Sequence, residues 1–259
     1  MPQMLFLGTG FSSGVPEGNC ACEVCEKARD MSSPFFRTRS SVLIEHDGKN
    51  ILIDAGTDFR FQTIKHNVRK IDAVLITHAH EDHIGGIPDL RGFSSTWGND
   101  PALSMYCRQQ EINALKRRFG YIFDENVTST KPKFGVKTIE PGKPFDVFGL
   151  TVTPMLVSHP PEDAFGFRIN DLAYIPDAKT IPSESMKLLQ GIKTLVILGN
   201  SDESYPKQMS IFEAAEIAKT LKAERVFFTH IGHRVQRNKA DQTLPPHMKL
   251  AFDGLKIDF

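Results

Sequence analysis

The sequence lacks three features that would each point to a whole class of protein. Its 31 basic residues are balanced by 31 acidic ones, so it has no excess positive charge of the kind that holds nucleic acid. It has no run of 18 or more apolar residues that could span a bilayer. Residues 1–6 also lack the basic start and long apolar core of a signal peptide. We therefore expect a cytoplasmic protein, with neither nucleic acid nor a membrane as its partner.

Cysteine is also scarce, and its placement is uneven. The chain has four cysteines, of which Cys20, Cys22 and Cys25 lie within one short segment. This spacing is too close for disulfide bonds among the three, whereas three thiolates suit a structural zinc ion that finds a fourth donor elsewhere. Thiolates reserved for zinc agree with a reducing compartment. Cys107 has the pattern of a buried apolar strand residue and is assigned no chemistry.

Histidine is concentrated in a short segment directly after the apolar run 73–76. There His78, His80 and His83 accompany Asp82. In an extended chain, residues two apart point the same way, so His78 and His80 can converge on one ion, while Asp82 and His83 can reach a second. This mixture of nitrogen and oxygen donors suits Zn²⁺ or Mn²⁺. We therefore predict two divalent metal ions at an active site.

Two ions need more ligands than one loop supplies, and three candidates occur later in the chain. His159, Asp177 and His230 each stand at the C-terminal end of an apolar run that has the pattern of a strand. Layered α/β scaffolds build active sites from the ends of separate strands on one rim. We expect these three side chains to converge with the histidine segment.

The chain as a whole is predicted to be a single domain, 1–259, without a linker or internal repeat. Hairpins are predicted around residues 47–50 and around Asn170-Asp171. A helix followed by a strand is predicted twice, at 64–68 before 71–77 and at 214–221 before 225–229, the latter helix opened by a capping box of Ser210 and Glu213. Two similar halves indicate two sheets packed face to face with helices outside.

These motifs resemble those of a known superfamily. The pattern His-x-His-x-Asp-His at 78–83 is that of the metallo-β-lactamase superfamily, and the resemblance spans almost the whole chain. The glycine-rich opening at 8–16 and the cysteine segment at 20–25 are similar to those of the PhnP-type cyclic phosphodiesterases and of coenzyme PQQ synthesis protein B. The resemblance implies an αββα four-layer sandwich, of mixed α+β and α/β character.

The same resemblance implies a role for each candidate ligand. It assigns one active-site metal to His78, His80 and His159. It assigns the second to Asp82, His83 and His230, with Asp177 as the bridge between them. It supplies His233 as the fourth ligand of the structural zinc on Cys20, Cys22 and Cys25. It also makes Asp54 an acceptor that orients a ligating histidine.

A dinuclear centre of this kind supplies a hydroxide for attack on an electrophile. We therefore expect a metal-dependent phosphoric diester hydrolase that acts on a small cyclic phosphate or nucleotide, with Asp82 as the catalytic carboxylate. PhnP-type enzymes carry a histidine about twenty residues before the last metal histidine, and this chain has Gln208 there. Because an amide cannot protonate an alkoxide, either another group does so or the leaving group is acidic. The loop offers four candidates, which are Asp202, Glu203, Tyr205 and Lys207.

Other functions stay open. A noncatalytic or cofactor-biosynthesis protein like coenzyme PQQ synthesis protein B would share the cysteine segment, but the intact histidine motif argues against it. An RNA-processing nuclease of the same superfamily is disfavoured by the balanced charge, since the basic run 116–118 has the pattern of a solvated helix face. A thioester or lactone hydrolase is a weaker alternative. The sequence leaves the oligomeric state open, a homodimer included.

Overall fold

The computed structural model describes residues 1–96, 101–235 and 243–259, and within them the strands form two sheets of seven strands each. The first sheet has the order β14-β1-β2-β3-β4-β5-β6, with β1 at Gln3–Gly8, β2 at Ser41–His46, β3 at Lys49–Ile53, β4 at Ala73–Leu75, β5 at Leu103–Cys107, β6 at Phe134–Thr138 and β14 at Lys256–Asp258. The second has the order β13-β12-β11-β10-β9-β8-β7, with β7 at Phe145–Val147, β8 at Leu150–His159, β9 at Glu162–Ile169, β10 at Leu172–Ile175, β11 at Thr194–Leu198, β12 at Arg225–Thr229 and β13 at Met248–Leu250.

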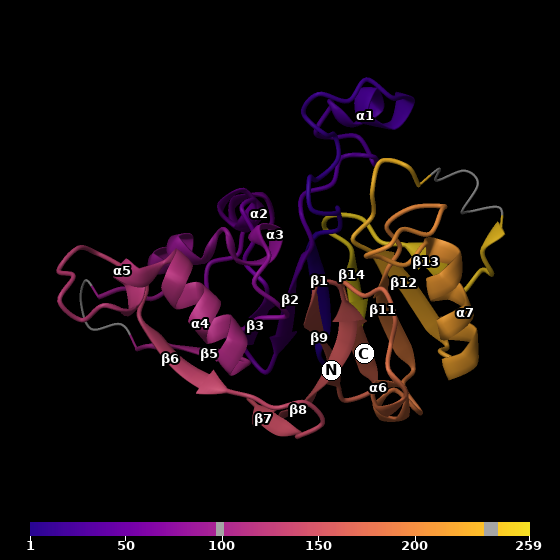
Figure 1. Cartoon of the computed structure of the whole chain (residues 1–259). Coiled ribbons are helices and arrows are strands. Elements are labelled where there is room, and N and C mark those ends of the chain that lie inside the picture. The colour runs from indigo at the N-terminus through magenta and orange to yellow at the C-terminus, as the bar shows by residue number, and fades with distance from the viewer. Residues whose placement is uncertain (97–100, 236–242) are drawn as a thin grey trace.

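The helices lie on the two outer sides of this pair of sheets, as Figure 1 shows. Beside the first sheet are α2 (Phe59–Lys65), α3 (Glu81–Ile84), the 3₁₀ helix η1 (Ile87–Gly92), α4 (Gln109–Arg118) and α5 (Gly120–Phe123). Beside the second are α6 (Ser183–Leu188) and α7 (Ile211–Leu221). A short helix, α1 (Glu23–Ala28), projects from the body at the top of the view.

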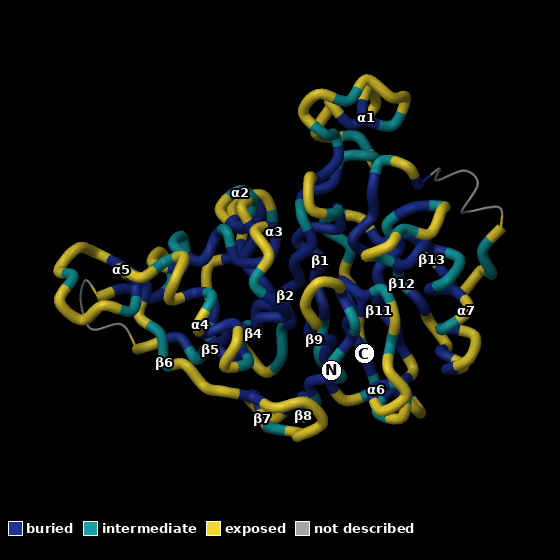
Figure 2. Tube along the Cα trace, viewed as in Figure 1, coloured by how far each residue is buried: buried dark blue, intermediate teal, exposed yellow. Residues whose placement is uncertain are grey.

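Three apolar clusters fill the spaces between these four layers. The central one joins the two sheets, because Phe6 and Ile44 of the first sheet share it with Phe165, Phe167 and Tyr174 of the second. One outer cluster packs α2 and α4 on the first sheet, and the other packs α7 on the second. Most strands in the middle of the two sheets are accordingly buried in Figure 2, whereas β6 is half-buried or exposed along its length. The predicted αββα sandwich is confirmed.

Local sequence explains where several elements begin and end. The two-residue turn Asp47-Gly48 has positive φ at both positions, 47° and 70°, which matches the right-handed twist of a hairpin and confirms that prediction. The capping box of Ser210 and Glu213 is present at the start of α7. The helix predicted at 64–68 is in fact α2, which starts earlier and ends at Lys65, because Asn67 takes a left-handed φ of 54°.

The strand directions place the candidate active-site residues at one end of each sheet. Strands β3 to β6 are parallel, and so are β10 to β13. Their C-terminal ends therefore lie at a common edge in each sheet, and the loops that follow form a rim. The predicted active-site ligands are in these loops or, for His159, at the end of the antiparallel strand β8.

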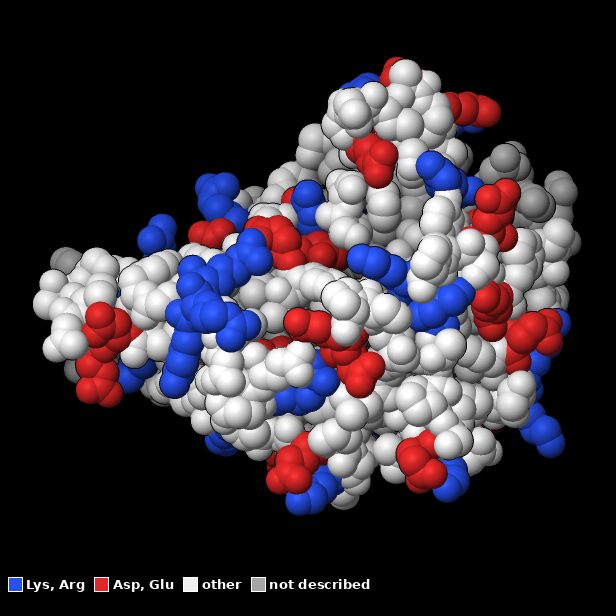
Figure 3. Space-filling model, in the orientation of Figure 1, with Lys and Arg blue, Asp and Glu red and all other residues white. Residues whose placement is uncertain are grey.

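The surface carries both signs of charge. Basic and acidic side chains are interspersed on the face in Figure 3, and the basic group to the left of its centre lies over α4. Lys116, Arg117 and Arg118 are exposed in the last turn of that helix, and Arg118 pairs with Glu81. The run is thus a solvated helix face, as predicted. Among the described residues, no helix combines the length and apolar character needed to cross a bilayer.

Candidate metal centre

The histidine segment is positioned by the end of β4 and the start of α3. His78 follows β4 in an extended stretch, and His80 is the N-cap of α3 with an extended backbone. The helix then turns Asp82 and His83 inward, where they are buried. His80 is exposed, so the segment faces solvent on one side.

The remaining candidates arrive from the second sheet. His159 is the last residue of β8, Asp177 lies two residues beyond β10, and His230 directly follows β12 with a left-handed φ of 53°. All three are buried, with at most 4% of each residue exposed. The rim therefore brings together residues separated by up to 152 positions in the chain, from His78 to His230.

One group of donors consists of His78, His80 and His159. His80 Nδ1 lies 2.8 Å from His78 Nε2 and 3.2 Å from His159 Nε2. One ring nitrogen from each falls within 4.8 Å of the others. Burial, followed by the positive charge of His83, holds the pKa of His78 well below its ordinary value. Burial and His159 also lower the pKa of His80. Neutral imidazoles keep the lone pairs that metal ligation requires.

A second group consists of Asp82, His83 and His230. Asp82 Oδ2 lies 3.2 Å from His83 Nε2 and 3.3 Å from His230 Nε2. Burial alone would raise the pKa of Asp82, but His83 and His230 lower it below its ordinary value. Burial likewise opposes the charge on His83, yet the Asp82 and Asp54 carboxylates outweigh it and raise the pKa of that imidazole. The Asp82 carboxylate and the two imidazoles of this group therefore attract one another.

Asp177 lies between the two groups. Its Oδ2 is 2.9 Å from His83 Nε2 and 3.2 Å from His230 Nε2, while its Oδ1 is 4.0 Å from His159 Nε2. Asp177 also forms a possible three-donor set with His78 and His83. This is the position that a bridging carboxylate would occupy.

These residues fit divalent ions by their contacts as well as by their chemistry. His83 Nε2 and Asp177 Oδ2 are buried and close together, yet neither takes part in a hydrogen bond of good geometry. Buried polar atoms are normally satisfied, so such a pair of atoms is suited to a shared ion. Nitrogen and carboxylate donors are the ligands that Zn²⁺ and Mn²⁺ accept. That the two groups bind these ions stays a prediction.

Asp54 orients His83, a member of the second group, through a hydrogen bond. It is fully buried and accepts hydrogen bonds from His83 Nδ1 at 2.7 Å, from Thr77 N at 2.8 Å and from Thr77 Oγ1 at 2.7 Å. Because His83 Nδ1 donates to Asp54, Nε2 is the ring nitrogen that faces Asp82 and Asp177. The orienting contact implied for Asp54 is therefore present. Thr77 was not anticipated, although its place at a strand end just before the histidine segment could have indicated it.

The loop that carries Gln208 contacts two of the candidate ligands, Asp177 and His159. Gln208 Nε2 donates to Asp177 Oδ1 at 2.9 Å, and His159 Nδ1 donates to the Lys207 carbonyl at 3.2 Å. Lys207 thus contacts the centre through its backbone. The Tyr205 hydroxyl accepts from Arg234. These contacts show that Gln208 points into the centre.

The three cysteines and His233 form a separate cluster beside α1. His233 Nδ1 lies 3.2 Å from Cys20 Sγ, 3.4 Å from Cys22 Sγ and 3.4 Å from Cys25 Sγ. Burial would raise the pKa of the Cys22 thiol, but hydrogen bonds from the Cys25 amide and His233 lower it to about 7. Three thiols and an imidazole suit a tetrahedral zinc. Cys107 is buried in β5, apart from this cluster, and burial raises its pKa to about 12.

Comparison with known proteins places the chain in a family. Residues 49–231, more than half of the chain, match the model of the beta-lactamase superfamily domain. The chain belongs to the beta-lactamase superfamily. A crystal structure of a new diphosphatase from the PhnP family is 33% identical, covers 100% of this chain and 98% of its own, and superposes with a TM-score of 0.90.

Two other proteins to which this chain is similar carry different names. An octanoyltransferase of Porphyromonas gingivalis is 33% identical over 255 residues, which are 97% of this chain, but this chain spans only 50% of that relative's length. The zinc-bound PqqB of Methylobacterium extorquens is 23% identical, covers 99% of this chain and 100% of its own, and shares the fold with a TM-score of 0.80. The family and the PhnP-family neighbour support a metal-dependent hydrolase.

Proposed function

We propose that this protein hydrolyses small phosphodiesters at a dinuclear metal centre. The observation that carries the proposal is the pair of donor groups joined by Asp177, with Asp82 at the second group. When bound there, two divalent ions lower the pKa of a coordinated water and neutralise phosphoryl oxygens. The relatives that lend support are the PhnP-family diphosphatase and a ribonuclease Z of Anoxybacillus flavithermus, which is 24% identical over 97% of this chain and 95% of its own length.

Each residue of the centre has a task in this proposal. His78, His80 and His159 would hold one ion, and Asp82, His83 and His230 would hold the other, with Asp177 between the two groups. Asp54 and the Lys207 carbonyl fix the tautomers of His83 and His159. Exposed His80 marks the side that is open to a substrate. A structural zinc on Cys20, Cys22, Cys25 and His233 would bring the total to three metals per chain.

The proposal is tested by replacing ligands. Asp82→Ala and His80→Ala should each abolish metal-dependent hydrolysis of bis(4-nitrophenyl) phosphate, because each removes a donor from the centre. Asp89→Ala serves as the matched control, since it removes a carboxylate outside both donor groups. Circular dichroism would establish that each variant is folded. Near-native turnover by a folded Asp82→Ala or His80→Ala protein would contradict the mechanism.

A second candidate is the cleavage of diphosphates. It is favoured by Gln208, whose amide donates to Asp177 and cannot protonate a leaving group. A phosphate leaves without a proton far more readily than an alkoxide does, because its second pKa is about 6. The likeness to a PhnP-family diphosphatase adds support.

We also propose that the substrate is a small molecule rather than a polynucleotide. The interspersed charges of Figure 3 offer no broad basic surface on that face for a phosphate backbone. Salt-dependent binding to structured RNA, measured by a titration over increasing salt concentration, would contradict this.

A further inference from the structure

We propose that a pocket beside the metal centre binds the leaving group of the substrate and selects one that carries a phosphate. The pocket, of about 240 Å³, is lined by Phe11, Asn200, Ser201, Tyr205, His233 and Arg234 among others. The inference rests on the proposed function, because it assigns the leaving group of the substrate to a pocket next to the proposed dinuclear metal centre.

The pocket adjoins the metal centre through the chain segments that leave β11 and β12. Gly232, two residues after His230, donates its backbone N–H to the Asn200 carbonyl at 2.8 Å and so joins the two segments. A side chain at this glycine would meet that carbonyl oxygen at 2.6 Å, which explains the residue type. Asn200 and Gly232 line the pocket, so this part of its wall follows a candidate ligand by two residues in the chain.

A single turn links the pocket to the position of the leaving group. Tyr205 donates its backbone N–H to the Gln208 carbonyl at 3.3 Å. The same turn thus places Gln208 on Asp177 and the Tyr205 ring in the pocket wall. A substrate held by the metals would extend its leaving group past Gln208 toward Tyr205.

Arg234 gives the pocket its chemical selectivity. Its guanidinium donates to the Tyr205 hydroxyl and lies 5.7 Å from the centre of that ring, which holds the planar group in place. The other N–H groups of such a fork match the oxygens of a phosphate. Glu17 also lines the pocket, but its carboxylate faces His233 Nε2 at 3.5 Å.

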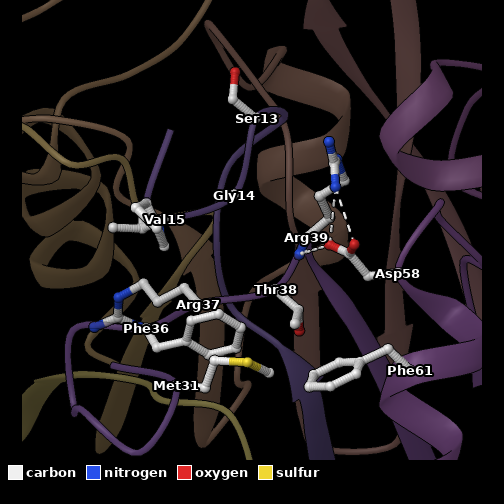
Figure 4. Close-up of a pocket in the computed structure, with 11 residues that line it drawn as sticks. Ser13, Gly14, Val15, Met31, Phe36, Arg37, Thr38, Arg39, Asp58 and Phe61 are labelled. Carbon is white, nitrogen blue, oxygen red and sulfur yellow. Dashed lines mark hydrogen bonds and ion pairs between the residues drawn. The ribbon is translucent and has the colours of Figure 1, made fainter. Parts of the chain in front are cut away.

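A second pocket, shown in Figure 4, makes a useful contrast. It has a volume of about 230 Å³ and an apolar base of Met31, Phe36 and Phe61. Its Arg39 lies 3.0 Å from both oxygens of Asp58 and donates through Nε to the Ser12 carbonyl at 2.8 Å. The guanidinium there is neutralised by a carboxylate. Arg234, bound to a neutral hydroxyl, keeps its charge available for an anion.

Position 208 offers no acid, and Arg234 offers a positive charge. Both features favour cleavage of the bridging P–O bond of a diphosphate. In a diphosphate diester, the oxygen of water forms a bond to one phosphorus, and the bridging P–O bond breaks with its electron pair left on the departing phosphate. The two protons of water pass to solvent, and the products are two phosphate monoesters. The departing phosphate needs no proton near pH 7, and its new charge would face Arg234.

Two substrates with the same attacked group test the inference. P1,P2-dimethyl diphosphate and methyl 4-nitrophenyl phosphate both present a methyl phosphoryl group, but only the former has a leaving group with a phosphate. Arg234→Gln should lower kcat/KM on the diphosphate by about 10- to 150-fold, the value of a charge-assisted hydrogen bond. The loss should appear mainly in KM, and activity on the aryl ester should stay within about twofold.

Further variants separate charge from shape. Arg234→Lys should restore part of the lost KM on the diphosphate, because it keeps the charge without the fork. Tyr205→Phe should cause a smaller loss on the same substrate, since it removes the hydroxyl that holds Arg234. Arg69→Gln is the matched control, because Arg69 is an exposed arginine that contacts Asn67 away from the centre. Thermal melting would establish that each variant is folded.

Several outcomes would overturn the inference. If Arg234→Gln lowered kcat/KM equally on both substrates, or on neither, Arg234 would not recognise the leaving group. A loss confined to the aryl ester would mean that the pocket takes an aromatic ring instead. Hydrolysis of the aryl ester without the diphosphate would end the inference and leave the proposed function intact. If neither substrate were cleaved, the proposed function itself would fail.

Discussion

Replacement of Asp54 by Asn offers a sharp test of how the metal centre is built. Asp54 is fully buried and has a left-handed φ of 62°, which Asn tolerates better than other residues apart from glycine. Its two oxygens serve three donors, and the contacts to His83 Nδ1 and Thr77 Oγ1 share Oδ2. Asn retains one oxygen and presents an NH₂ group in place of the other, so either His83 or the Thr77 amide loses its acceptor.

Loss of such an orienting contact typically costs about 10- to 100-fold in metal affinity, or about 1.4–2.7 kcal/mol. We expect Asp54→Asn to weaken ion binding at the dinuclear centre by this amount. The assay is a competition between the metal-depleted protein and a chelating dye. The cysteine cluster provides an internal reference, because its own ion should remain tightly bound.

Asp72→Asn is the matched control for this experiment. Asp72 is another carboxylate with little exposure, but it contacts Asn50, Lys49 and Lys70 rather than a candidate ligand. Its replacement should leave metal affinity unchanged. The reasoning would be refuted if Asp54→Asn bound both ions as tightly as the native protein, to within about twofold.

Three further predictions concern other parts of the molecule. Cys22→Ser should remove one zinc per chain and lower the melting temperature while the dinuclear centre remains; elemental analysis that finds unchanged zinc would contradict the structural site. Gln208→His should speed the cleavage of alkyl phosphodiesters by about 10²-fold relative to aryl esters, because it supplies an acid; a native rate that is independent of leaving-group pKa would argue against this. Burial would raise the pKa of Asp72, but the Asn50 amide and the Lys70 and Lys49 ammonium groups lower it. The stability that Asp72 contributes should therefore be complete above its unfolded pKa of about 4 and should be lost as the pH falls through the lower folded pKa. Denaturant unfolding should accordingly show that the difference in free energy of unfolding between the native protein and Asp72→Asn disappears in acid.

Local patterns in the sequence were enough to predict much of the fold. The hairpin turn at Asp47-Gly48 and the capping box at Ser210 depend on neighbouring residues, so their signals are complete in the sequence. The pairing of β14 with β1 joins the end of the chain to its beginning and has no such signal. The helix predicted at 64–68 had the wrong bounds, since α2 begins at Phe59 and the left-handed turn at Asn67 follows its end at Lys65.

The candidate site likewise has residues that the sequence indicated and contacts that it could not indicate. Ligand types and strand ends indicated His159, Asp177 and His230, and the structure places them beside the histidine segment. The contact of Gln208 with Asp177 could not be predicted, since it depends on how one loop folds back over a rim. The Tyr205–Arg234 pair likewise joins residues 29 positions apart through the packing of two loops.

The measurement that tests the account most directly is a titration of metal into the chelated protein with bis(4-nitrophenyl) phosphate as substrate. The account predicts that the protein without active-site metal is inactive. Turnover should then rise until two divalent ions per chain are bound in addition to the zinc of the cysteine cluster, and Asp82→Ala should show no such rise. Full turnover in the chelated protein, or in folded Asp82→Ala, would contradict the proposed dinuclear hydrolase.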